Sequence, residues 1–229
     1  MNSDEVRERW AERSGEYSPT YYAHYGPDET SDMILDLLDS LVGSDAAVLE
    51  LGCSSGRHLA HLHDHGYDDI HGVEINDEAF DVMADAYPDL ADAGTFYNDA
   101  IEEVAEEFDA NRFDAVFSVE TLQHIHPDDE AVFGELARIT GDLLVTVENE
   151  DRDGNRERGD DGERDEASPA SADDAESTEA AARRGVNYVR EEVPLYYRDW
   201  NRIFTELGFE EAECQPTKRD TLRAFRRED

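Results

Sequence analysis

Short apolar runs and stretches with helical spacing alternate along most of the chain. Val48, Leu49 and Leu51 form one run that is short enough for a buried strand. Between Met33 and Leu41, apolar residues instead recur three and four positions apart, which predicts a helix over 28–41 that Thr30 or Ser31 can cap. This alternation predicts an α/β domain in which helices cover a sheet.

The later elements follow the same order. Further strands are expected at 70–74, 95–97, 112–120 and 142–147, and paired edge strands at 209–214 and 221–225. Further helices are expected at 58–65, 77–87 with Asp77 as its cap, 101–108, 127–139 and 196–207.

Two segments stand apart from the α/β pattern. Residues 1–29 are rich in aromatics and are expected to form a helical cap, which either closes over a ligand or packs into a groove. Residues 150–185 are dense in Asp, Glu and Arg and hold no aromatic or large aliphatic residue, which predicts a disordered insertion. The domain itself is therefore assigned to 30–149 and 186–229.

A glycine-bracketed turn follows the first strand and precedes a helix. Gly52 and Gly56 enclose Cys53-Ser54-Ser55, and Glu50 lies at the strand's end. A strand, a glycine turn and a helix together aim backbone N–H groups at a ligand beyond the carboxyl end of the strand. A dehydrogenase fingerprint would place glycine at position 54, and a P-loop would continue Gly-Lys-Ser/Thr. The acidic turn favours a ligand that is cationic or rich in hydrogen-bond donors.

The run Glu50-Leu51-Gly52-Cys53-Ser54-Ser55-Gly56 resembles the E/D-x-G-x-G/S-x-G signature of class I S-adenosylmethionine-dependent methyltransferases. Phe113-Asp114-Ala115-Val116-Phe117-Ser118 and Leu122-Gln123-His124-Ile125 resemble that family's fourth strand and its continuation. The resemblance implies a three-layer Rossmann-like sandwich, with a mostly parallel seven-stranded sheet that ends in an antiparallel hairpin. It also implies S-adenosylmethionine as cofactor.

The resemblance assigns roles to individual residues. Glu74 ends the second strand 18 positions after Gly56, where an acid would accept hydrogen bonds from both ribose hydroxyls. Asp99 would accept from the adenine amino group, although it could instead cap the following helix. The full set of expected cofactor-binding residues is Glu50, Gly52, Cys53, Ser54, Gly56, Glu74, Ile75, Asp99, Ala100 and Ser118.

His124 is the candidate general base, because an unperturbed histidine titrates near neutrality. The alternative is that it only orders its loop. His61 and His65 are spaced like two metal ligands, but Leu62 stands where the H-E-x-x-H pattern requires glutamate, so no metal site is expected.

Net charge changes the picture of the surface. The chain carries 59 acidic and 20 basic residues, a net charge of −39, and Lys218 is its single lysine. Such a surface repels itself at low salt but not at molar salt, so we expect a halophilic protein that loses structure on dilution into low KCl. Far-UV circular dichroism across a KCl titration tests this, and an unchanged fold at very low salt would contradict it.

The same charge disfavours nucleic acid and anionic membranes as partners. No apolar run approaches a membrane span, and the N-terminus lacks a signal peptide's apolar core, so a cytoplasmic enzyme is expected.

Direct in-line methyl transfer to a small molecule is therefore the expected activity. An oxidoreductase that uses a nicotinamide cofactor and a non-catalytic protein that binds S-adenosylmethionine remain as alternatives. The acceptor and the oligomeric state cannot be read from the sequence.

Overall fold

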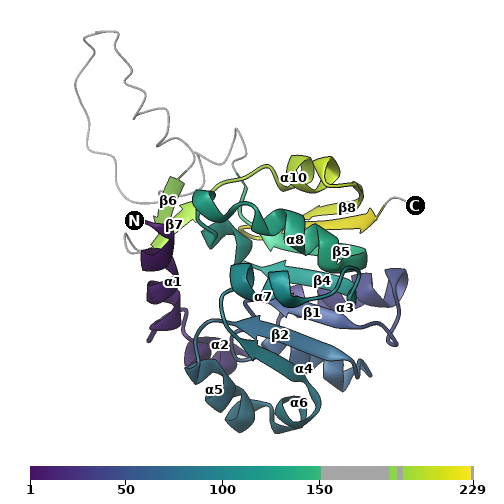
Figure 1. Cartoon of the computed structure of the whole chain (residues 1–229). Helices are drawn as coiled ribbons and strands as arrows, with labels where there is room; N and C mark the ends of the chain where they lie inside the picture. The colour runs from purple at the N-terminus through teal and green to yellow at the C-terminus, as the bar shows by residue number, and fades with distance from the viewer. Residues whose placement is uncertain (151–185, 190–192, 228–229) are drawn as a thin grey trace, which may run out of the picture.

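The computed structural model describes residues 1–150, 186–189 and 193–227 (Figure 1). The predicted insertion at 150–185 thus lies, beyond Glu150, outside the described residues. The helices are α1 (Ser3–Ala11), α2 (Pro19–Tyr25), α3 (Glu29–Leu41), α4 (Arg57–Asp64), α5 (Glu78–Ala86), α6 (Pro88–Ala93), α7 (Ile101–Glu107), α8 (Val132–Ile139) and α10 (Trp200–Glu206). The strands are β1 (Val48–Leu51), β2 (Ile70–Glu74), β3 (Thr95–Asn98), β4 (Phe113–Val119), β5 (Thr140–Glu148), β6 (Val186–Val189), β7 (Val193–Tyr196), β8 (Phe209–Pro216) and β9 (Thr221–Arg227).

Seven strands form one sheet in the order β3-β2-β1-β4-β5-β9-β8. The first five are parallel, and β9 runs antiparallel to both β5 and β8. This confirms the predicted fold class. The prediction that both hairpin strands are edge strands is wrong for β9, because it pairs with β5 and leaves only β8 at the edge.

Alternate residues of the central strands enter two separate cores. Val48 packs with α3 and α4 on one face of the sheet, while Leu49 and Leu51 pack with α7, α8 and α10 on the other. Both faces are covered, as parallel sheets require, and the helices of the two layers are visible in Figure 1. Register pairs Leu51 with both Val73 and Ser118, so β1, β2 and β4 end at one edge of the sheet.

The capping contacts of two helices differ from the prediction. Asp28 is the N-cap of α3, where its Oδ1 accepts hydrogen bonds from the N–H groups of Thr30 and Ser31, and Ser31 Oγ accepts in turn from the N–H of Asp28. Asp77 stands at the N-cap position of α5, as predicted, but its side chain makes no capping hydrogen bond, and Asn76 Oδ1 accepts from the N–H of Glu78 at 3.1 Å.

Several boundaries also differ from the prediction. The expected helix at 127–139 is a single 3-10 turn over Pro127–Asp129 followed by α8. The expected helix at 196–207 is shorter, because Tyr196 belongs to β7, which pairs with β6 in a two-stranded sheet outside the main one. α1 and α2 fall within the N-terminal segment that is expected to be helical, whereas α6 was not predicted. Among the helices described here, none combines the length and apolar composition needed to cross a bilayer.

Candidate functional site

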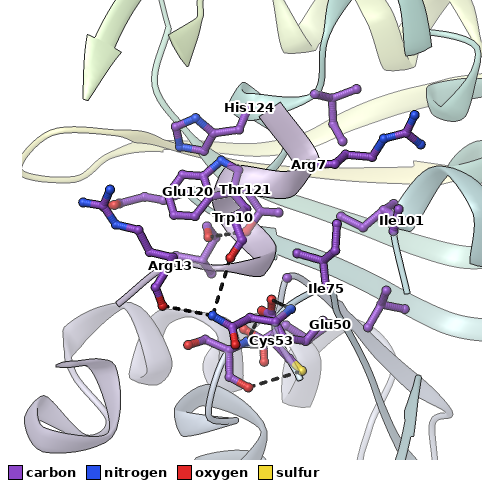
Figure 2. Close-up of a pocket in the computed structure, with 18 of the residues that line it drawn as sticks. Arg7, Trp10, Arg13, Glu50, Cys53, Ile75, Ile101, Glu120, Thr121 and His124 are labelled. Atoms are coloured by element: carbon purple, nitrogen blue, oxygen red, sulfur yellow. Dashed lines mark hydrogen bonds between the residues drawn. The ribbon is translucent and has the colours of Figure 1, made fainter. Parts of the chain in front are cut away.

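A cavity opens where β1, β2 and β4 end, and the N-terminal segment forms its opposite wall. Glu50, Gly52, Cys53 and Ser54 line it from the first strand and its turn. Figure 2 shows Trp10 and His124 on the side of the cavity across from Glu50 and Cys53, with Ile75 and Ile101 flanking the space. The site therefore lies at the carboxyl edge of the sheet, as expected for an α/β fold.

Backbone hydrogen bonds hold the turn after β1, and its close packing leaves no room for a side chain at Gly52. The N–H groups of Gly52 and Cys53 both donate to the Val73 carbonyl, at 2.9 and 3.0 Å. Gly52 has φ +69°, and a Cβ there would lie 2.5 Å from Thr121 Cγ2. Gly56 has φ +79° and begins α4, but it packs on Met83 and Leu90 and does not line the cavity.

Glu50 is a buried carboxylate at the floor of the cavity. Its side chain is 2% exposed, and Oε2 has no hydrogen-bond partner in the described part of the chain. Burial raises its pKa well above the ordinary value, Arg57 opposes that shift, and the charge of Glu74 adds to it. An unpaired buried carboxylate is costly, and a ligand that brings a cation or an N–H donor relieves that cost.

Glu74 forms hydrogen bonds with the turn after β1 and with the residues that follow β2. Its Oε2 accepts from the N–H of Ser54 and its Oε1 from the N–H of Asn76, each at 2.8 Å. Burial raises the pKa of Glu74, while these backbone hydrogen bonds lower it. Because each carboxylate oxygen accepts more than one hydrogen bond, both remain able to accept from a diol.

Asp99, Ala100 and Ile75 line the cavity beyond Glu74, at the ends of β3 and β2. The alternative that Asp99 caps α7 is wrong, because Ala100 is the cap position and no side chain bonds to the helix there. Asp99 Oδ1 accepts from the N–H of Ala100, at 2.8 Å, and the residue is exposed.

Ser118 was expected at the cofactor, but it does not line the cavity. Its hydroxyl donates to Glu148 Oε1 at 2.6 Å, and the residue is buried. The side chain therefore faces β5 and not the cavity, so Ser118 is not part of the proposed cofactor site.

His124 lines the cavity as a neutral imidazole. Its Nδ1 lies 2.9 Å from the Pro194 carbonyl, which can only accept, so Nδ1 carries the proton and Nε2 presents a lone pair. Burial lowers the pKa of His124 to about 4. At neutral pH it thus accepts hydrogen bonds but is a weaker base than the sequence suggested.

The N-terminal segment is anchored on the strand that carries Glu74. Asn76, which is 3% exposed, donates through Nδ2 to the carbonyls of Trp10 at 3.5 Å and Arg13 at 3.0 Å. Trp10 lies on the cavity wall with its ring 4.7 Å from that of His124. The segment therefore packs on the domain and also lines the cavity, and its closing over a ligand stays a prediction.

Several residues that line the cavity were not predicted, among them Arg7, Asn76 and Thr121. Asn76 follows the acid of β2 by two positions, so its place at a strand end could have identified it. Glu120, which is expected at the carboxyl end of the fourth strand where methyl donor and acceptor would meet, directly follows β4 and lines the cavity. Glu120 also has φ +50°, a strained backbone conformation that is frequent at functional sites.

Comparison with known proteins agrees with this geometry. Residues 48–142 match the family model described as "Methyltransferase domain". No curated protein matches the chain in sequence.

Several solved structures share the fold. A Pyrococcus horikoshii protein is 16% identical with a TM-score of 0.61, covering 93% of this chain and 95% of its own. The magnesium protoporphyrin IX methyltransferase of Synechocystis with bound S-adenosylhomocysteine is 15% identical with a TM-score of 0.61, covering 98% and 94%. A Burkholderia thailandensis 1,6-didemethyltoxoflavin-N1-methyltransferase is 14% identical with a TM-score of 0.59, covering 88% and 79%.

These likenesses establish the fold, while the matched segment contains the glycine turn, Glu74 and Asp99. The chain therefore has the Rossmann-like methyltransferase fold, and its central segment matches a methyltransferase domain.

Proposed function

We propose that the protein transfers a methyl group from S-adenosylmethionine to a small-molecule acceptor. The observation that carries the proposal is Glu50, a carboxylate buried at the glycine turn with one oxygen unpaired and a cavity above it. A cofactor with a cationic sulfur and an amino group supplies the charge and the donors that this carboxylate lacks. A nicotinamide dinucleotide would instead place its anionic pyrophosphate at the glycine turn, beside this carboxylate.

The residues on the cavity wall fit the three parts of that cofactor. Glu50 and the turn at Gly52–Ser54 would hold the methionine portion. Glu74 would accept from the ribose hydroxyls, and Asp99 with Ala100 and Ile75 would hold the adenine. Cys53 contributes as a small buried residue, since burial raises the pKa of its thiol well above the ordinary value and keeps it unreactive.

Bound S-adenosylmethionine supplies an activated methyl group on its sulfonium. The protein's own contribution is to hold an acceptor in line with that methyl group, at roughly 3–3.5 Å from it. Trp10, Glu120, Thr121 and His124 form the wall that would face the acceptor. Glu120 and the neutral His124 both accept hydrogen bonds, which favours an acceptor that carries N–H or O–H groups.

Two solved structures of similar fold are small-molecule methyltransferases with ligands bound, one acting on magnesium protoporphyrin IX and the other on 1,6-didemethyltoxoflavin. They support a small-molecule acceptor here, as does the lack of a basic surface in a chain of net charge −39.

Isothermal calorimetry with S-adenosylmethionine, S-adenosylhomocysteine and NADH tests the proposal. We propose that the acidic chain is adapted to high salt, so the titrations belong in molar KCl. We expect both sulfur nucleosides to bind and NADH not to bind, and a preference for NADH would overturn the assignment. Tight binding without methyl transfer to any small molecule would favour a non-catalytic binding protein.

The position of Trp10 gives an optical measure of the same site. The chain has two tryptophans, Trp10 on the cavity wall and Trp200 in the core beside Phe133 and Phe204. We expect S-adenosylhomocysteine to change the emission of the wild type and of Trp200→Phe, and to leave Trp10→Phe unchanged. A response that survives Trp10→Phe would place the ligand away from the N-terminal segment.

A further inference from the structure

One loop forms a side of the cavity and packs against the glycine turn. It follows β4 and places Glu120, Thr121, His124 and Ile125 on the cavity wall. The side chain of Thr121 also occupies the space that a Cβ on Gly52 would need. Any movement of this loop therefore changes both the acceptor wall and the support of the turn.

Glu148, the last residue of β5, receives the N–H groups of this loop. Its Oε1 accepts from the N–H groups of Thr121 at 3.2 Å and Leu122 at 3.1 Å, and its Oε2 accepts from Gln123 at 3.1 Å. Ser118 Oγ donates to the same carboxylate at 2.6 Å. The side chain is fully buried, so no water substitutes for a lost partner.

Arg198, which follows β7, holds the carbonyl groups of the same loop. Its guanidinium donates to the carbonyls of Leu122 at 3.4 Å and Ile125 at 2.7 Å, while Nε donates to Glu130 at 3.0 Å. Arg198 is 9% exposed. A planar fork of donors can satisfy several fixed acceptors at once, which an ammonium cannot do in the same geometry.

We propose that Glu148 and Arg198 form a clamp of positioning residues, one binding the N–H groups and the other the carbonyls of the loop at 121–125, and that this clamp fixes the acceptor-facing wall of the cavity. The clamp rests on the proposed function only because that wall would face the methyl acceptor. Neither residue lines the cavity, so both act through the loop.

Ionisation of Glu148 gives the clamp a measurable signature. Burial raises the pKa of Glu148 to about 7, against the hydrogen bonds from Ser118 and the loop amides, which lower it. Arg198 and Asp220 act on this region together with Glu120, His124 and Glu130, which lie on or beside the loop, and burial raises the pKa of Asp220 to about 8. As pH rises through 7, the loop amides should therefore gain a charged acceptor.

Amide NMR of the whole chain, alone and with S-adenosylhomocysteine, tests the clamp. In the wild type we expect the amide shifts of residues 121–123 to titrate near pH 7. Glu148→Gln should abolish this step, because an amide side chain does not ionise and offers an N–H group where at least one loop N–H needs an acceptor. Asp220→Asn, which removes the neighbouring carboxyl, should retain the step.

Amide exchange and ligand affinity complete the test. In Glu148→Gln and in Arg198→Lys we expect the loop amides to exchange about 10- to 100-fold faster, as for the loss of a hydrogen bond to a charged group. The affinity for S-adenosylhomocysteine should change by about twofold or less, because Glu74 and the glycine turn keep their own hydrogen bonds to each other and to Val73. Unchanged loop exchange in both variants, or a step near pH 7 that survives Glu148→Gln, would overturn the clamp. A wild type that does not bind S-adenosylhomocysteine would instead overturn the proposed function.

Discussion

Replacing Glu50 with glutamine is expected to weaken the binding of S-adenosylmethionine while stabilising the ligand-free protein. The carboxylate is 2% exposed and Oε2 lacks a partner, so its charge costs folding free energy until a ligand arrives. Losing a charged hydrogen bond to the cofactor costs about 1.5–3 kcal/mol, or roughly 10- to 150-fold in Kd. Calorimetry measures the affinity, and thermal unfolding without ligand measures the stability.

The stability gain of Glu50→Gln should depend on pH with a definite sign. Burial raises the folded-state pKa of Glu50 well above 4.5, so the folded wild type holds a proton that the unfolded chain has lost. Wild-type stability therefore falls as pH rises from 4.5 toward that raised pKa, and glutamine removes this fall. The difference in stability between Glu50→Gln and the wild type should vanish below about pH 4.5 and grow as pH rises from there toward the raised pKa of Glu50.

Opposite signs of the two effects separate a binding role from a purely structural one. A structural Glu50 would make the glutamine variant both less stable and a weaker binder. Asp114→Asn is the matched control, because Asp114 accepts from the N–H of Ala47 at the far end of β1 and does not line the cavity. That variant should keep its cofactor affinity. Unaltered affinity in Glu50→Gln would remove the main support for the proposed cofactor site.

The sequence allowed the glycine turn and the acids at strand ends to be placed correctly because their signals are local. A strand that ends in an acid and runs into a small-residue turn has few possible geometries, and Glu50, Glu74 and Asp99 all line the cavity. The mostly parallel sheet and its terminal antiparallel hairpin followed from the resemblance, since apolar runs alone do not specify which strands are neighbours.

Contacts between distant segments could not be predicted in the same way. Glu148 lies at the end of an apolar strand, and nothing near it in sequence shows that three amides of another loop converge on it. Ser118 was assigned to the cofactor from its place at a strand end, but its hydroxyl turns to that same carboxylate. The docking of Trp10 and Arg13 on Asn76 joins residues more than sixty positions apart.

The β6–β7 hairpin shows a further reason for error. Tyr196 continues the apolar spacing of the helix that begins at Trp200, so the pattern predicts one helix over both. The pairing of β7 with β6 overrides that pattern and places the Pro194 carbonyl against His124. That contact sets the tautomer of His124, and with burial it makes this residue a hydrogen-bond acceptor of low basicity.

Replacing Gly52 with alanine is expected to be the most damaging single substitution at the site. Its φ of +69° is unfavourable for alanine by about 1–2 kcal/mol, and the new Cβ would overlap the Thr121 side chain, which adds about 1–3 kcal/mol of overpacking. We expect the free energy of unfolding to fall by about 2 to 5 kcal/mol. Cofactor binding should also weaken, because the displaced turn carries the amides next to Glu50.

Gly66→Ala is the matched control for Gly52→Ala, because it has the same kind of backbone without the crowding. Gly66 has φ +94°, and no atom would lie within 4 Å of its new Cβ. The Gly66→Ala variant should therefore lose only about 1–2 kcal/mol of stability, the conformational cost of alanine at positive φ, and should bind S-adenosylhomocysteine as the wild type does. Denaturant unfolding and calorimetry on both variants measure the contrast. Equal losses of stability and affinity in the two variants would mean that Thr121 moves aside for the added methyl group. The site would then not depend on close packing of the loop after β4 against the turn.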